Sequence, residues 1–188
     1  MDILSDDSLF KIQRYYFGGL NLAHFEKFTL HGFCDASDIA YAAVVYIIGI
    51  TSNRILSSFS AAKTKVAPLV KPSTPIMELY GCVLLSHLVA NVKEALTEEI
   101  SISGVVCWSD SLDALHWIKN EKKVRPRAIQ SRVMKIRKLV PAANWRHCPT
   151  ELNPAYVASR GIPTQRAVRK EFPKCIVGPE FIVMDTTK

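Results

Sequence analysis

The sequence predicts an α/β domain with a mixed sheet and helices packed on its faces. Three strand-like runs follow one another early in the chain and are separated by short turns. A long segment with helical spacing of apolar residues comes next, and shorter strand-like and helix-like segments then alternate. The chain has 188 residues, of which 48% are hydrophobic and 22% charged, which is typical of one folded domain.

The first half of the predicted sheet comes from three consecutive strands. Residues 25–34 alternate apolar and polar side chains, and the polar residues 35–38 end this strand. Residues 40–50 are nearly all apolar and rich in Val, Ile and Tyr, which predicts a strand covered on both faces. A turn at residues 51–53 leads to a third strand over residues 55–62. Consecutive strands with such short connections predict an antiparallel meander.

The longest predicted helix covers residues 76–96, where apolar side chains recur every three or four positions. Pro75 precedes it, at a position where the first helical turn tolerates proline. Residues 102–108 have the length and the β-branched content of a buried strand. A short helix over residues 112–119 is expected to follow.

The last elements are a basic helix, a short strand and a short helix. Ile129, Val133 and Ile136 have helical spacing within the basic segment, so its apolar side is expected to pack on the domain. A strand at residues 144–148 and a helix at residues 154–159 complete the order β-β-β-α-β-α-α-β-α. This order predicts the mixed sheet with flanking helices.

The positive charge of the chain is concentrated in one segment. The net charge is +7, and residues 122–138 contain eight basic and no acidic side chains. The rest of the chain is nearly neutral, with 16 basic and 17 acidic side chains. A cationic helix face suits a polyanion such as nucleic acid, because binding releases condensed counterions. A solvated helix surface without a partner explains the same pattern, and the charge run alone does not separate the two.

Several classes of protein are not expected. The longest unbroken apolar run, residues 39–50, has 12 residues, short of the roughly 20 that a membrane-spanning helix needs. The first seven residues are acidic, so they do not resemble a secretory signal. The five scattered cysteines contain no Cys-x-x-Cys pair, so neither a disulfide framework nor a zinc site is predicted. We expect an intracellular protein, cytoplasmic or nuclear and not secreted, with mostly buried free thiols and no membrane contact.

Three carboxylates stand at the ends of predicted elements. Asp35 follows the first strand, Glu78 lies in the first turns of the long helix, and Asp110 follows the fourth strand. Such positions can converge at one edge of a sheet, where ligands bind. Converging carboxylates favour Mg²⁺ or Mn²⁺, and paired divalent ions catalyse phosphodiester hydrolysis. Each residue also has an ordinary role as a turn former, helix cap or partner of the helix dipole.

The sequence around these acids resembles the ribonuclease H-like region of Pol polyproteins from BEL/Pao-type LTR retrotransposons. The resemblance covers residues 25–181 and follows the order of the family's motifs. The matching segments include His31-Gly32-Phe33-Cys34-Asp35-Ala36-Ser37, Pro75-Ile76-Met77-Glu78-Leu79, Trp108-Ser109-Asp110-Ser111, Trp145-Arg146-His147-Cys148-Pro149, Asn153-Pro154-Ala155 and Ala158-Ser159-Arg160-Gly161.

This resemblance implies an RNase H-like fold, in which a five-stranded mixed sheet has three antiparallel strands followed by parallel additions. It also implies a hydrolase, an endonuclease that cuts the RNA strand of RNA–DNA hybrids during reverse transcription. Asp35, Glu78 and Asp110 match the first three carboxylates of the family's site for Mg²⁺ or Mn²⁺. Tyr156 stands where the family has the fourth, and a neutral phenol is a poor magnesium ligand. We therefore expect one metal site to be retained, the second metal to be held loosely, hydrolysis to be weak or absent, and hybrid binding to be at least partly retained.

The family assignment also divides the chain and suggests its partner. We expect residues 1–24 to resemble the end of a reverse transcriptase connection segment, residues 25–165 to form the domain, and residues 166–188 to lead toward a next polyprotein unit. The expected partner is an RNA–DNA hybrid. The residues expected to contact it are Lys63, Lys65, Lys122, Lys123, Arg125, Arg127, Arg132 and Lys135. The alternative is a non-catalytic nucleic-acid-binding or protein-interaction remnant of the same fold.

Overall fold

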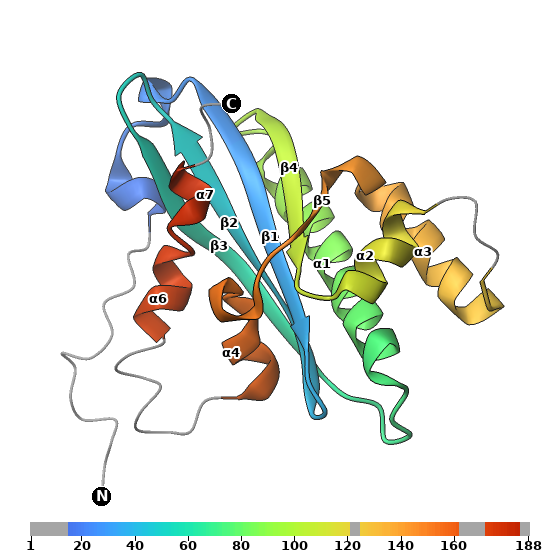
Figure 1. Cartoon of the computed structure of the whole chain (residues 1–188). Helices are drawn as coiled ribbons and strands as arrows, with labels where there is room; N and C mark the ends of the chain where they lie inside the picture. Colours follow the sequence, from blue (N-terminus) through green and yellow to red (C-terminus); the bar gives the residue numbers. More distant parts are fainter. Residues whose placement is uncertain (1–14, 121–124, 162–171, 185–188) are drawn as a thin grey trace, which may run out of the picture.

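Five strands form one mixed sheet in the order β3-β2-β1-β4-β5 (Figure 1). The strands are β1 (Lys27–Ala36), β2 (Ala40–Ile50), β3 (Ile55–Val66), β4 (Ile102–Ser109) and β5 (Trp145–His147). The first three strands are antiparallel neighbours, whereas β4 runs parallel to β1 and β5 runs parallel to β4. This computed structural model describes residues 15–120, 125–161 and 172–184. It confirms the predicted fold class and the antiparallel meander.

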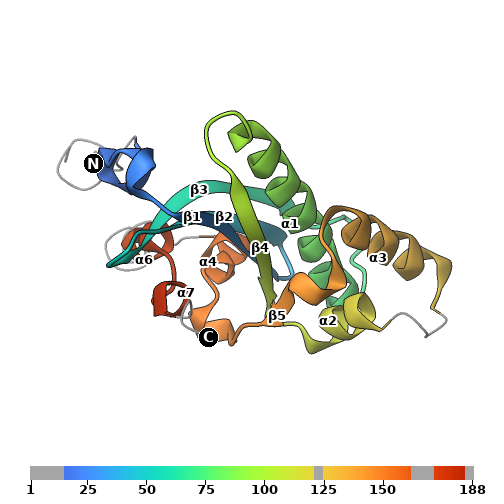
Figure 2. The same ribbon diagram turned by 90° about the horizontal axis from the view of Figure 1, so that it is seen from above.

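Helices cover both faces of the sheet. They are α1 (Thr74–Leu96), α2 (Leu112–Lys119), α3 (Arg127–Leu139), α4 (Ala155–Arg160), α6 (Phe172–Val177) and α7 (Phe181–Met184), with short 3₁₀ helices η1 (Tyr16–Gly19), η2 (Leu22–His24), η3 (Ala142–Asn144) and η4 (Thr150–Leu152). Figure 2 shows α1 on one side of the sheet and α4, α6 and α7 on the other. The helices α2 and α3 pack against α1.

The alternation of side chains along the strands creates two separate cores. On the α1 side, Leu30 and Cys34 of β1 pack with buried residues of α1 such as Leu85. On the opposite side, Phe33 and Tyr46 pack with Ile182 of α7. Successive residues of a strand point to opposite faces, so the continuous apolar sequence of β2 supplies both cores.

Several element boundaries differ from the sequence-based expectation by a few residues. The strand β3 continues to Val66, four residues beyond the predicted end, because β2 pairs with it along its whole length. Residues 63–65 near its end are polar and exposed, so their sequence carries no strand pattern. The helix α1 begins at Thr74 and α3 at Arg127. Lys122 and Lys123 lie outside the described residues.

The helix α1 is long and apolar enough to cross a membrane by length and composition. Half of its most apolar window is buried inside the protein, where it packs against β1 and β2. The central helix of a globular domain meets the same length and hydropathy criteria. The apolar character of α1 is therefore explained by its place in the core of this domain.

The cysteine side chains are mostly buried free thiols, as the sequence predicts, and two tryptophans pack internally. All five cysteines are free thiols, four of them buried. Trp145 is fully buried, and the ring of Trp108 stacks on Phe33. The described part of residues 1–24 also contacts the sheet, because Phe17 packs against Phe28 of β1.

Candidate functional site

The ends of two parallel strands and the start of α1 bring three carboxylates to one edge of the sheet. Cys34 of β1 pairs with Ser109 of β4, so Asp35 and Asp110 are the next residues along two adjacent parallel strands. Glu78 lies in the first turns of α1, which packs across β1. Asp35 is buried, and Glu78 and Asp110 are half-buried. In α/β sheets this edge, at the carboxyl ends of the strands, is the usual location of ligand sites.

The ionisation behaviour of these groups shows that they lie within electrostatic reach of one another. Burial raises the pKa of Asp35, and the nearby Asp110 raises it further, while Ser159 and Arg160 oppose the shift. Burial also raises the pKa of Glu78, with contributions from Asp110 and Asp35. Clustered carboxylates favour protonation because each charge repels the next. The site is therefore a pocket of negative charge that a cation would stabilise.

A hydroxyl group from a different segment hydrogen-bonds to each carboxylate. Ser159 of α4 donates to Asp35, and Ser111 at the start of α2 donates to Glu78. Thr150 of η4 donates to Asp110, at 2.8 Å. Sequence reasoning did not identify these hydroxyls, although two of them stand in the matching motifs, in Trp108-Ser109-Asp110-Ser111 and Ala158-Ser159-Arg160-Gly161.

The side chains of Asp35, Glu78 and Asp110 are not arranged as a metal-binding site in this structure. Within residues 15–120, 125–161 and 172–184, no group of three or more His, Cys, Asp or Glu side chains could hold an ion as they are placed. In this arrangement each of the three carboxylates accepts a hydrogen bond from one hydroxyl group. A divalent ion bound here would compete with these hydroxyl groups.

Tyr156 lies on α4, the same helix that supplies Ser159 to Asp35. Its side chain is 39% exposed, so it does not fill the core. The guanidinium of Arg160 lies over the Tyr156 ring, 4.3 Å from its centroid. Ser159 also donates to the Tyr156 carbonyl, at 3.0 Å. The position at which the resemblance places a fourth carboxylate thus carries an aromatic ring that packs against a cation.

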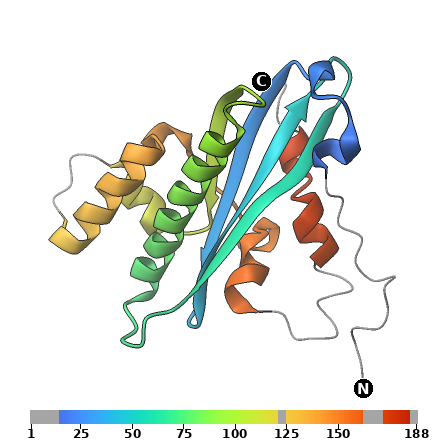
Figure 3. The same ribbon diagram turned by 180° about the vertical axis from the view of Figure 1, so that it is seen from behind.

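The basic residues of α3 lie on the side of the domain that α1 covers. In Figure 3, α1 lies between α3 and β3. Arg132 packs on the Tyr80 ring of α1, 4.7 Å from its centroid, and donates to the Tyr80 hydroxyl. Arg127 and Lys135 are exposed on α3.

The remaining cations of the predicted set have different surroundings. Arg125 donates from Nη2 to the Asn120 carbonyl, but its Nε and Nη1 atoms are buried without a hydrogen-bond partner. Lys63 and Lys65 are exposed on β3, near its end.

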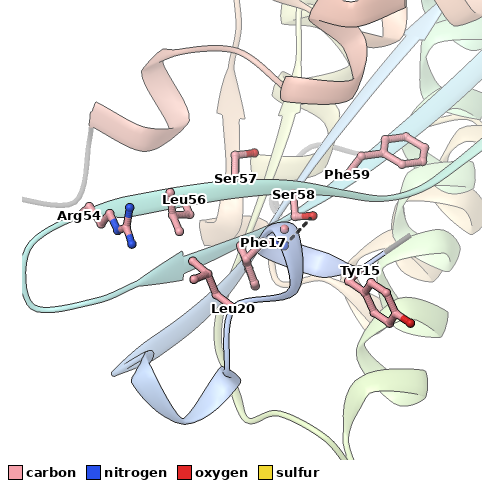
Figure 4. Close-up of a pocket in the computed structure, with 9 residues that line it drawn as sticks. Tyr15, Phe17, Leu20, Arg54, Leu56, Ser57, Ser58 and Phe59 are labelled. Carbon is pink, nitrogen blue, oxygen red and sulfur yellow. Dashed lines mark hydrogen bonds between the residues drawn. The ribbon is translucent and has the colours of Figure 1, made fainter. Parts of the chain in front are cut away.

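A cavity lies away from the carboxylates, between η1 and the first half of β3 (Figure 4). Its volume is about 360 Å³. Phe17 and Leu56 contribute apolar surface, and Arg54 is the one charged residue of its lining. The cavity has no acid or histidine in its lining, so it has no group suited to hydrolytic chemistry.

Comparison with known proteins identifies one matching family. A family described as the Pao retrotransposon-like RNaseH-like domain matches residues 2–111. No curated protein matches the chain.

Similar solved structures have low sequence identity to the chain. The N-terminal RNase H domain of a Mycobacterium tuberculosis protein is 14% identical, with 71% of this chain and 95% of that chain covered and a TM-score of 0.45. LC11-RNase H1 from compost, in complex with RNA/DNA hybrid, is 12% identical, with coverage of 68% and 88% and a TM-score of 0.37. The foamy viral protease-reverse transcriptase, also with RNA/DNA hybrid, is 14% identical, with coverage of 80% and 21% and a TM-score of 0.35.

Proposed function

Because the chain belongs to the Pao retrotransposon-like RNaseH-like domain family, we propose that it binds RNA–DNA hybrids and hydrolyses their RNA strand weakly or not at all. The observation that carries this proposal is the grouping of Asp35, Glu78 and Asp110 at one sheet edge, with Tyr156 on the helix beside them. Hydrolysis would be the ancestral activity, and binding would be the property that persists.

Asp35, Glu78 and Asp110 would hold Mg²⁺ or Mn²⁺. Their donor chemistry fits, since hard divalent cations prefer carboxylate oxygens. The raised pKa values of Asp35 and Glu78 also favour a cation, which would offset their mutual repulsion. When bound, such an ion activates water and stabilises charge on the leaving oxygen. Since hydroxyl groups already occupy the carboxylates, we expect divalent cations to bind weakly.

Tyr156 explains the expected loss of hydrolysis. Two-ion hydrolysis of phosphodiesters needs a second ion beside the first, and a second ion needs more negative ligands than Asp35 alone supplies. A phenol is a weaker ligand for Mg²⁺ than a carboxylate, and Arg160 adds a positive charge next to the Tyr156 ring. Both features disfavour a second divalent cation at this side of the site.

The cationic surface of α3 supports binding of nucleic acid. Arg127 and Lys135 are exposed, so they are free to approach phosphates.

The test is binding of a fluorescently labelled RNA–DNA hybrid to the full chain, measured by anisotropy in EDTA at several salt concentrations. We expect affinity to fall steeply with salt, because binding displaces counterions. Lys135→Gln should reduce the slope of log K against log salt by about 1. Lys93→Gln is the matched control, since Lys93 is an exposed helix lysine roughly 22 Å from Glu78 along α1. Absence of hybrid binding at low salt would refute the proposal and favour a protein-interaction remnant.

A further inference from the structure

The sheet has one long edge strand whose outer side has no backbone partner in the described part of the chain. The strand order places β3 and β5 at the two edges, and β3 has 12 residues whereas β5 has 3. No backbone hydrogen bond joins β3 to an element other than β2 within residues 15–120, 125–161 and 172–184. The outward N–H and C=O groups of β3 are therefore able to pair with another extended chain.

The first part of this edge lacks the features that commonly protect edge strands. Such strands are protected by charged side chains, proline, a bulge or a very short length. Residues 55–59 contain no charged residue and no proline, and their register with β2 is regular, because the shift in register falls at Ser60. Beyond that shift, Lys63 and Lys65 supply the charges of a protected edge. Residues 55–59 are therefore the open edge of β3.

The helix η1 lies beside the open edge without pairing with its backbone. The Phe17 N–H donates to Ser58 Oγ at 3.5 Å, and the Tyr16 hydroxyl lies 3.4 Å from Ser60 Oγ. The cavity of about 360 Å³ lies between η1 and this part of β3 (Figure 4). Phe17, Leu20 and Leu56 give it apolar surface. An added strand could thus place an apolar side chain in this cavity while its backbone pairs with β3.

The charge of this surface favours an acidic partner. Residues 39–77 contain no acidic side chain, and their four basic residues are Arg54, Lys63, Lys65 and Lys71. Arg54 is exposed and lines the cavity at the start of the open edge. Its guanidinium forms no hydrogen bond or ion pair with another residue that the structure describes. A carboxylate from a partner would form a charge-assisted hydrogen bond with it.

An extended peptide satisfies this surface better than nucleic acid or a second copy of the chain. Phosphodiester groups accept hydrogen bonds but donate none, so they would leave the outward C=O groups of β3 unpaired. A second copy would present the same edge, in which residues 39–77 offer no carboxylate to Arg54. A peptide backbone supplies both donors and acceptors, and its side chains can supply the acid.

We propose that the open edge of β3 binds an extended acidic segment of a partner protein, which adds a sixth strand to the sheet. An apolar side chain of this segment enters the cavity beside η1, and a carboxylate pairs with Arg54. The cavity lies away from Asp35, Glu78 and Asp110, so this interaction leaves the carboxylate site accessible. The proposal does not depend on whether the chain binds or cuts RNA–DNA hybrids.

Binding of short synthetic peptides to the full chain tests the charge preference. The fluorescent peptides share one alternating Val and Thr sequence with a central Leu, and they differ only in their end residues, which are Asp, Ser or Lys. We expect the acidic peptide to bind about tenfold more tightly than the basic one, because only its carboxylate pairs with Arg54. Arg54→Glu should remove this preference. Lys93→Glu, the same change of charge at an exposed position of α1, should retain it.

Backbone pairing is tested separately from charge. The acidic peptide is N-methylated at one position at a time, which removes one backbone donor. Every second position should weaken binding, because alternate N–H groups of an added strand face the edge strand. Amide hydrogen exchange of the full chain should slow within residues 55–59 when the acidic peptide is bound. Arg54 is exposed, so its replacement should leave exchange in the free chain unchanged elsewhere.

These measurements support or overturn the proposal as follows. A preference for the acidic peptide that is lost in Arg54→Glu, together with an alternating N-methyl pattern, supports it. Main-chain hydrogen bonds supply much of the affinity in strand addition, so failure of all three peptides to bind would overturn it. Displacement of the peptide by RNA–DNA hybrid, with the same amides protected by the hybrid, would reassign the surface to nucleic acid. Self-association of the wild-type chain that protects residues 55–59 would reassign it to a second copy.

Discussion

Individual hydroxyl groups organise the carboxylate site. Ser159, Ser111 and Thr150 each donate to one acid, so none of the three carboxylates depends on water or on an ion for a partner. Hydrogen bonds to an ionised carboxylate lower its pKa, yet those of Asp35 and Glu78 remain raised because burial is the larger effect. The ionised carboxylates of Asp35 and Glu78 therefore lower the free energy of unfolding, as charged groups in functional sites commonly do.

Replacing Asp35 by Asn should increase stability, and the gain should grow with pH. The pKa of Asp35 in the folded state is raised above its ordinary value of 3.8. The folded state therefore binds the proton more tightly than the unfolded state, and the free energy of unfolding falls as the pH rises through these two pKa values. It remains lowered at pH 7. Asn remains neutral and still accepts the bond from Ser159. Urea unfolding in EDTA at pH 4 and pH 7 measures the effect. Glu98→Gln, at an exposed position, is the control, and an equal effect in both variants would disprove the explanation.

The residues that act from other elements could not be predicted from the sequence. Asp35, Glu78 and Asp110 were identifiable because each stands at the end of a recognisable strand or helix. Ser159 lies 124 positions from Asp35, and no local pattern indicates that their side chains meet. Pairing across such distances depends on how α4 packs on β1, which single-sequence patterns do not contain.

Elements with strong periodicity were predicted well. The strand β2 and the helix α2 have the bounds that their sequences indicate. The sequence did not predict the last four residues of β3, because hydrogen bonding to β2, and not burial of apolar side chains, stabilises the strand there. The helices α6 and α7 were not expected, since they are short and have no repeating apolar pattern. Tertiary contacts decide the structure of such segments.

Close packing of α1 on β1 depends on Gly32. A Cβ atom at this position would lie 2.6 Å from Leu85 Cδ1 and 3.0 Å from Val89 Cγ2, and both side chains are buried. Gly32→Ala should therefore lower the free energy of unfolding by about 1–3 kcal/mol. Urea denaturation provides the measurement.

The matched control for this substitution is Gly104→Ala on the neighbouring strand β4. There the added Cβ would lie 3.4 Å from Thr29 Cγ2, an ordinary contact. Its effect should stay within about 0.5 kcal/mol. If Gly32→Ala is as neutral as this control, α1 does not approach β1 as closely as described.

At the scale of the whole molecule, the C-terminal segment completes the second core. Phe181 of α7 contacts the rings of Phe33 and Trp108, and the Tyr46 hydroxyl donates to the Cys175 carbonyl. These contacts join a segment beyond residue 165 to the central strands. The expected division at residues 165 and 166 stays a prediction, and the packing of α7 provides a way to test it.

Ile182→Ala should lower the free energy of unfolding by about 2–5 kcal/mol, because the Ile182 side chain is only 1% exposed. Met184→Ala, two residues away and 69% exposed, is the control and should change it by less than about 0.5 kcal/mol. Thermal and urea unfolding of the full chain measure both. If Ile182→Ala and Met184→Ala both left the free energy of unfolding unchanged, the domain would end before α7.

The central proposal is that Asp35, Glu78 and Asp110 form a ribonuclease H-type carboxylate site whose hydrolytic activity is weakened or abolished by Tyr156. The most direct measurement is cleavage of the RNA strand of a labelled hybrid, in Mg²⁺ or Mn²⁺, by the wild-type chain, Tyr156→Asp and Tyr156→Asn. The asparagine variant removes the ring without adding a charge, so it separates the effect of losing the aromatic ring from the effect of adding a carboxylate. The account predicts that Tyr156→Asp cleaves at least about tenfold faster than the wild type and that Tyr156→Asn does not, since a carboxylate is required to hold the second ion. Equal cleavage by the wild-type chain and Tyr156→Asp would contradict it.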